Sequence, residues 1–150
     1  MPTIQRSARV PYSAAQMLAL VNDIEAYPSF LHWCHAARIE NRSGRVVEAA
    51  LEIGVSGIHK TMRTRNTTDE GDSNRASSIR IDMLDGPLAR LEGAWIFRDC
   101  ATAGCEIDLR LEYETHRTPF GLLLRALFDE IANSQLKAFI QRADDVFGDA

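Results

Sequence analysis

Few residues of this chain combine the types and the spacing that metal binding or catalysis requires. His32 and His35 are the best pair, because they lie three positions apart and could share one face of a helical turn. A catalytic zinc site needs three protein ligands, and no carboxylate or third histidine lies near this pair in the sequence. We therefore expect no metal site, and we expect these histidines at the surface or at the rim of a pocket.

The sequence also lacks the motifs of a catalytic serine, a zinc-binding helix, a phosphate-binding loop and a dinucleotide-binding turn. Its carboxylates mostly alternate with apolar residues, as Glu112 and Glu114 do. Solvation on the polar face of a strand explains this placement without catalysis. We expect no catalytic residue and no cofactor, so a small-molecule cyclase or hydrolase ranks third, after the two functions described at the end of this section.

A group of basic residues falls within the segment IHKTMRTR, residues 58–65. It could form a solvated strand face whose charges pair with carboxylates across the sheet, which is the commoner role of such runs. It could also bind the phosphates of RNA. The candidates for RNA contact are Arg42, His59, Lys60, Arg63 and Arg65. The formal net charge of −4 argues against an overall basic surface, and we expect no DNA binding.

Aromatic residues gather in YPSFLHWC, residues 27–34, and recur on the predicted strands and in the C-terminal segment. Core packing explains each of them alone. Together they also fit the rim of an apolar pocket, because Trp and Tyr combine an apolar body with a polar group. The candidate ligand-binding residues are Tyr27, Phe30, Trp33, Met83, Leu91, Trp95, Phe97, Leu109, Leu111, Phe128 and Ile131.

Hydrophobic periodicity predicts the elements that must position these residues. Alternation over residues 3–10 predicts a strand, and Ser13 with Gln16 forms a capping box that begins a short helix ending near Asn22. Pro28 begins or interrupts a second short helix. From residue 36 to 115 the alternation is broken by turn residues, which predicts about six antiparallel strands.

A helical period returns after Thr118 and continues from about Phe120 to Phe147, with Gly148 as its end. Such a helix is roughly 40 Å long and can cover the apolar face of an antiparallel meander. We therefore expect one α+β domain over residues 1–150. Its curved antiparallel sheet of about six to seven strands surrounds the long C-terminal helix, and two short helices follow the first strand.

Composition predicts a soluble, cytoplasmic protein. A chain of 150 residues can bury a core without disulfides, and no run approaches the 18 or so apolar residues that span a bilayer. The beginning of the chain has no apolar segment typical of a signal peptide. Cys34, Cys100 and Cys105 form no C-x-x-C pair, so we expect free thiols in a reducing compartment.

Four ordered motifs resemble those of the coenzyme Q-binding START-like family, within the polyketide cyclase-like superfamily. They are YPSFLHWC at residues 27–34, Asp85-Gly86-Pro87, L-x-G-x-W-x-F at residues 91–97, and FIQRADDVFG at residues 139–148. The resemblance covers the chain from Ile4 to Gly148. The sequence departs from the family pattern at His32, where proline is usual, and at Leu88, where phenylalanine is commoner.

This resemblance implies a helix-grip fold, in which an apolar cavity lies between the sheet and the long helix. Family members bind quinone or another isoprenoid lipid without catalysis, and one branch is similar to a bacterial ribosome association toxin. That toxin binds the large ribosomal subunit and blocks subunit joining. Under the resemblance, Phe30 and Trp33 point toward the ligand or its entrance.

Two functions follow as expectations, and one domain could serve both. The first is non-catalytic binding of ubiquinone or a similar isoprenoid lipid in the cavity, which would support respiratory electron transport. Polar groups near Tyr27 and Arg6 would orient the head of the lipid, and transient membrane contact is a further expected partnership. The second is toxin-like inhibition of the ribosome, in which the candidates for RNA contact bind the large subunit and binding weakens steeply with salt.

Overall fold

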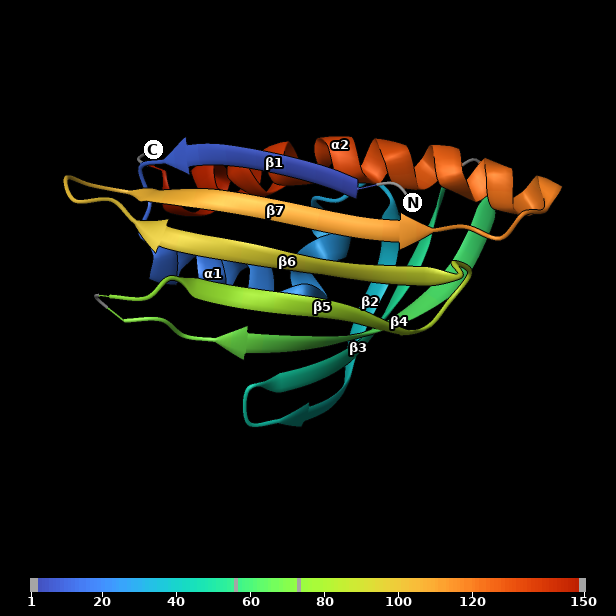
Figure 1. Cartoon of the computed structure of the whole chain (residues 1–150), viewed down its shortest axis with the longest axis horizontal. Helices are drawn as coiled ribbons and strands as arrows, with labels where there is room; N and C mark the ends of the chain where they lie inside the picture. The colour runs from blue at the N-terminus through green and yellow to red at the C-terminus, as the bar shows by residue number, and fades with distance from the viewer. Residues whose placement is uncertain (1–2, 56, 73, 149–150) are drawn as a thin grey trace.

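The computed structural model describes residues 3–55, 57–72 and 74–148, and it has a curved antiparallel sheet with a long helix along its inner side (Figure 1). The seven strands of this described part are β1 (Thr3–Val10), β2 (Cys34–Ser43), β3 (Val46–Val55), β4 (Ile58–Asp69), β5 (Ser77–Asp85), β6 (Arg90–Asp99) and β7 (Cys105–Glu114). Their order in the sheet is β1-β7-β6-β5-β4-β3-β2. The architecture confirms the predicted α+β, helix-grip fold.

Strands β2 to β7 form a meander, whereas β1 joins the sheet through a contact between distant parts of the chain. β1 pairs antiparallel with β7, and Ile4 lies opposite Leu111 while Ala8 lies opposite Ile107. Side chains of one parity therefore continue from strand to strand on the inner face of the sheet. On β7, Ile107 is fully buried and Tyr113 is 1% exposed.

Two short helices connect β1 to β2, as predicted. Helix α1 (Ala14–Asn22) begins with the predicted capping box, in which the Ser13 hydroxyl accepts from the Gln16 backbone N–H and the Gln16 side chain accepts from the Ser13 N–H. The second, η1 (Ile24–Ser29), is a 3-10 helix with Pro28 inside it. The Tyr27 hydroxyl donates to the Val21 carbonyl oxygen, which ties η1 to α1.

The long helix α2 spans Pro119–Phe147, one residue earlier than predicted at its start. The Thr118 side chain caps it by accepting from the Gly121 N–H at 2.9 Å, and proline is well suited to the first helical position because the N–H that it lacks has no partner there. Its 29 residues give a length of about 43 Å. Figure 1 shows α2 running along nearly the whole molecule, so this helix closes the inner side of the sheet.

Aromatic side chains fill much of the space between the sheet and the C-terminal half of α2. Phe139 of α2 is fully buried and makes edge-on ring contacts with Trp95 of β6, at 5.1 Å, and with Tyr27 of η1, at 5.3 Å. Trp95 also stacks on Phe97 with 5.9 Å between the ring centroids. The strands, η1 and α2 thus meet in one aromatic core.

Candidate functional site

An apolar cavity of about 80 Å³ lies between the inner face of the sheet and α2. We call it the inner cavity. Seven of the predicted ligand-binding residues line it: Tyr27, Trp33, Leu91, Trp95, Leu111, Phe128 and Ile131. They come from η1, the segment before β2, the strands β6 and β7, and α2, and alternation on the strands turns them to the same side.

Four of the predicted ligand-binding residues do not line the inner cavity. Phe97 and Leu109 are no more than 1% exposed and pack within the core, and Met83 is half-buried near the end of β5. Phe30 is half-buried beside Phe139 at 5.2 Å, with the Arg142 guanidinium 5.1 Å from the Phe30 ring centroid. These residues have the parity or the aromatic character of cavity residues, but the structure places them outside the cavity lining.

Arg6 also lies away from the inner cavity, although the sequence suggested that it could orient the head of a ligand. Strand β1 is an edge strand, and Arg6 is exposed on it. Its guanidinium donates to the Asn133 side chain of α2. The contact joins the edge of the sheet to the helix instead of entering the space between them.

The residues that the sequence analysis missed include every amide side chain of the inner cavity. Beyond the seven predicted residues, the lining consists of Leu51, Met62, Thr64, Asn66, Ile81, Tyr113, Ala132 and Gln135. Met62, Thr64 and Asn66 alternate along β4 within and just after the basic segment. This alternation is a sequence signal that the three residues share one face of the strand. The basic side chains at the opposite parity indicate the outer face, and only that face was assigned a function from the sequence.

Two buried amide oxygens in the lining have no hydrogen-bond donor among the described residues. They are Oδ1 of Asn66, a residue that is 7% exposed, and Oε1 of Gln135. A buried acceptor without a partner costs about 1–3 kcal/mol. A guest that satisfies these atoms must donate a hydrogen bond, as water or a hydroxyl group does. The carbonyl oxygens of a quinone ring could accept from the NH2 groups of these amides but could not satisfy their oxygens.

The size of the inner cavity restricts its guests further. An apolar cavity that binds benzene in another protein measures about 150 Å³, and a water molecule occupies about 30 Å³ of liquid. The 80 Å³ available here is about half of the benzene-binding volume, so the cavity has room for water but not for an aromatic ring. A ring-sized ligand would require α2 or the lining side chains to move apart.

The lining contains no carboxylate, imidazole, thiol or amine among its described residues. Its titratable groups are the phenols of Tyr27 and Tyr113, and burial raises the pKa of both above the ordinary value of 10.0. Tyr113 also donates to the Asp129 carboxylate, and this hydrogen bond raises the pKa of Tyr113 further. Neither phenol can act as a general base near neutral pH. The described residues also contain no group of three or more side chains that could hold a metal ion.

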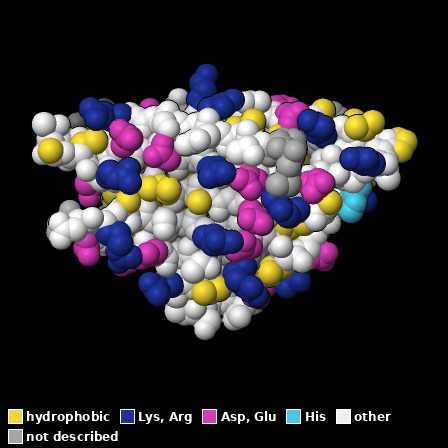
Figure 2. All heavy atoms as spheres, in the orientation of Figure 1, with side chains coloured by type: hydrophobic (Ala, Val, Ile, Leu, Met, Phe, Trp, Pro, Cys, Tyr) yellow, Lys and Arg dark blue, Asp and Glu magenta, His cyan; other side chains and the backbone are white. Residues whose placement is uncertain are grey.

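The basic segment on β4 forms ion pairs with carboxylates of β3, its neighbour, and of β2, the next strand. Arg63 donates to Glu40 at 2.7 Å, Arg65 to Glu48 at 3.0 Å, and His59 lies 3.0 Å from Glu52. The Arg63 guanidinium holds the pKa of the Glu40 carboxyl below its usual range. Figure 2 shows Lys, Arg, Asp and Glu side chains interspersed over the outer face of the sheet. The structure therefore favours the solvated, paired face over a uniformly basic patch.

The other two candidates for RNA contact form no ion pair with the described residues. Lys60 is exposed, and its Nζ lies 5.0 Å from the centroid of the Phe120 ring at the start of α2. Arg42 is exposed near the end of β2. These two cations can meet an external phosphate without first losing a carboxylate partner.

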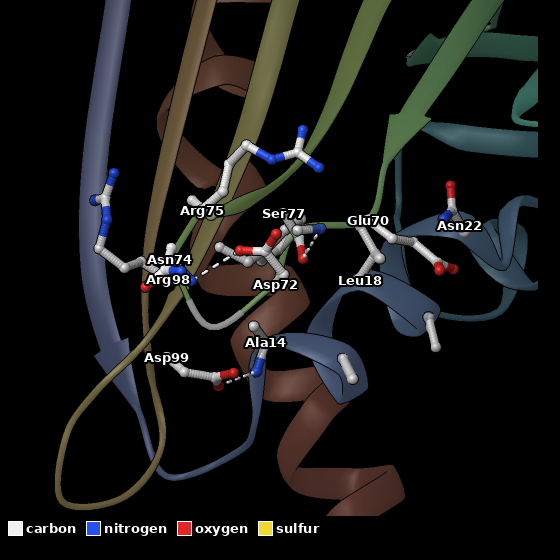
Figure 3. A pocket seen from close by; sticks show the side chains of 15 residues that line it. Ala14, Leu18, Asn22, Glu70, Asp72, Asn74, Arg75, Ser77, Arg98 and Asp99 are labelled. Atoms are coloured by element: carbon white, nitrogen blue, oxygen red, sulfur yellow. Dashed lines mark hydrogen bonds between the residues drawn. The ribbon is translucent and has the colours of Figure 1, made fainter.

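A second, open groove of about 640 Å³ lies between α1 and the connection from β4 to β5 (Figure 3). Its charged groups largely serve the fold. Asp99 accepts from the Ala14 N–H at 2.8 Å, and Arg75 donates to Asp69 at 2.6 Å. Glu70, Asp72 and Arg98 add charges of both signs, which do not favour one class of ligand. We assign no ligand to this groove.

A family model described as polyketide cyclase / dehydrase and lipid transport matches residues 10–140. The ribosome association toxin RatA of Escherichia coli (strain K12) is 37% identical over 98% of this chain and 90% of its own. The mitochondrial coenzyme Q-binding protein COQ10 homolog B of Xenopus laevis is 24% identical over 91% of this chain and 56% of its own.

The Zhui aromatase/cyclase from Streptomyces sp. R1128 has a similar solved structure. Its TM-score is 0.80 at 15% identity, and the match covers 95% of this chain and 93% of that chain. At this identity the likeness extends to the fold alone.

Proposed function

The chain belongs to the polyketide cyclase / dehydrase and lipid transport family, of START-like fold, and from this membership we propose that it acts as a ribosome association toxin. The observation that carries the proposal is the 37% identity to E. coli RatA over 98% of this chain. The COQ10 relative is less similar, at 24%, and the match covers 56% of that protein. The higher identity and the larger covered share of the relative support the RatA function over the COQ10 function.

The proposed action is binding without catalysis. Relatives of this fold include an aromatase/cyclase, so fold alone does not separate enzymes from binding proteins. The lining of the inner cavity has no described side chain that could take up or release a proton near neutral pH. This composition supports a binding protein.

The proposed partner is the large ribosomal subunit, with a block of subunit joining as the effect and the cytoplasm as the location. Arg42 and Lys60 would contact ribosomal RNA directly. Arg63 and Arg65 would exchange Glu40 and Glu48 for phosphates. Exposed ion pairs contribute about 0–1 kcal/mol each, so this exchange costs little. The described part of the chain has no helix with the length and hydrophobicity to cross a membrane.

Co-sedimentation with purified ribosomal subunits tests the proposal. The wild-type protein should pellet with large subunits at about 50 mM salt, and its affinity should fall about tenfold or more by about 200 mM. Arg63→Glu with Arg65→Glu should weaken binding. Arg110→Glu is the matched control, because Arg110 is an exposed, carboxylate-paired arginine on β7. Absence of the protein from the pellet at both salt concentrations would reject ribosome association.

A second candidate function is binding of ubiquinone or a similar lipid in the inner cavity. The apolar lining and the COQ10 relative support it, whereas the volume of about 80 Å³ argues that the cavity must first expand. Mass spectrometry of an organic extract from the purified protein, compared with a mock purification, tests it. Ubiquinone at about one molecule per chain would support this function, and an extract equal to the mock would leave ribosome association as the sole candidate.

A further inference from the structure

Large apolar side chains are exposed together at the start of α2. Among the described residues, the exposed large hydrophobic side chains are Leu84, Phe120, Leu122, Leu123 and Val146. Three of them fall within four consecutive positions, and they are 39%, 67% and 52% exposed in chain order. We call Phe120, Leu122 and Leu123 the apolar tip. Exposed apolar residues that cluster in this way often mark an interaction surface.

The apolar tip is held on a well-defined helix start. Thr118 caps the helix and Pro119 occupies its first position. Gly121 faces inward so closely that a Cβ atom there would lie 1.9 Å from the His116 carbonyl oxygen. Leu124, which is 2% exposed, also faces the core. With Gly121 and Leu124 packed inward, Leu122 and Leu123 must face outward, and the core does not use them.

Cations surround the apolar tip. The fourteen residues from Thr115 to Phe128 contain no carboxylate, although the chain has a net charge of −4. Arg117 and Arg125 line one hollow with Leu122, and Lys60 lies over the Phe120 ring. None of these three cations forms an ion pair with the described residues. The start of α2 lies at the right-hand end of Figure 1, and at the same end Figure 2 shows hydrophobic side chains beside Lys or Arg side chains.

Two other titratable groups line the same hollow. Glu114 contributes one negative charge at the end of β7, and His116 is exposed in the connection to α2. With histidine neutral, Lys60, Arg117 and Arg125 still outnumber Glu114. The local balance is therefore positive and opposite in sign to that of the whole chain.

We propose that the apolar tip docks on the surface of an anionic phospholipid bilayer. Leucine and phenylalanine side chains enter the boundary between headgroups and acyl chains, while surrounding Lys and Arg residues attract acidic headgroups. RNA offers phosphates to the cations but no apolar phase to Leu122 and Leu123. The proposal does not rest on ribosome association, because the tip is separate from the β4 arginines and shares only Lys60 with the candidates for RNA contact.

Vesicle flotation with the full chain tests this docking. We expect the wild-type protein to float with vesicles in which about a third of the lipid is phosphatidylglycerol, and to remain unbound with phosphatidylcholine alone. Leu122→Ser with Leu123→Ser should reduce the bound fraction about tenfold, because these side chains supply most of the inserted apolar surface. Arg117→Glu with Arg125→Glu should abolish the preference for anionic vesicles.

Val146→Ser is the matched control, since Val146 is 48% exposed at the opposite end of α2. It should bind vesicles as the wild type does, and all variants should keep the wild-type thermal midpoint. Flotation of the double leucine variant at the wild-type level would overturn the proposal, and so would a wild type that binds neither vesicle. Loss of large-subunit pelleting with unchanged flotation in that variant would instead identify the tip as a ribosomal contact and would also overturn it.

Discussion

The space between the sheet and α2 is filled differently beside Phe139 and beside Phe128. Beside Phe139, rings from η1, β6 and α2 meet edge-on at 5.1–5.3 Å, and we call this the packed end; its Tyr27 and Trp95 rings also border the inner cavity. Beside Phe128, Asn66 and Gln135 bring buried amide oxygens into the inner cavity, and we call this the hollow end. The same helix covers both, so the side chains decide whether the interior closes.

The comparison separates stability from ligand binding. At the packed end the aromatic rings reach close contact with one another, and the buried Tyr27 hydroxyl has its partner in the Val21 carbonyl oxygen. At the hollow end, amide groups need donors that the neighbouring apolar residues do not provide. A ligand therefore gains the most binding free energy at the hollow end, where the protein's own polar atoms lack partners among the described residues.

Truncation of a ring should show the largest difference between the two ends. Replacing a buried Phe by Ala costs about 3–5 kcal/mol. For Phe139→Ala the loss in the free energy of unfolding should be near the upper limit of this range, because the rings around Phe139 are tightly packed. Phe128→Ala should lie near the lower limit, since Phe128 already borders a cavity. Urea denaturation measures both free energies of unfolding. An equal or larger loss for Phe128→Ala would contradict the distinction.

Replacement of a buried amide should change the free energy of unfolding in the opposite direction, toward higher stability. Asn66→Leu keeps a similar size and removes an acceptor that has no described donor, so we expect a gain of about 1 kcal/mol in the free energy of unfolding. Thermal and urea denaturation check this value. A loss of stability would mean that the Asn66 amide is satisfied in solution, and the hollow end would then be an ordered polar site.

The smallest expected effect on stability comes from the buried thiols. Their reactivity also tests how well the interior excludes solvent. Burial raises the pKa of Cys34 and of Cys105 to about 11, from an ordinary 9.0. The unfolded chain therefore loses these protons first, and their contribution to stability, complete below pH 9, should decline as the pH rises from 9 through 11. Iodoacetamide at pH 8 should modify the half-buried Cys100 first. Mass spectrometry of the alkylated protein identifies the order, and early modification of Cys34 would indicate an open interior.

Much of the fold could be predicted from local sequence. The capping box of Ser13 and Gln16, the alternation on the strands and the extent of α2 agree with the structure within a residue or two. Capping and periodicity depend on residues that are close in the chain, so each can be recognised without knowing the fold.

The candidate site could be predicted only in part, because parity indicates the face of a strand but not what covers it. Leu109 and Leu111 share a parity on β7, yet Leu109 lies in the core and Leu111 lines the inner cavity. The charge run on β4 similarly gave no sign of which carboxylates would lie opposite it.

By itself, then, the sequence determined the order of the elements, the inner face of most strands but not of β4, and the absence of a recognised catalytic motif. Only the tertiary structure brought Asn66 of β4 and Gln135 of α2 into the inner cavity, and Lys60 over the ring of Phe120. These residues are far apart in the chain. Their contacts depend on strand register and on where α2 crosses the sheet, and many distant interactions fix those positions together.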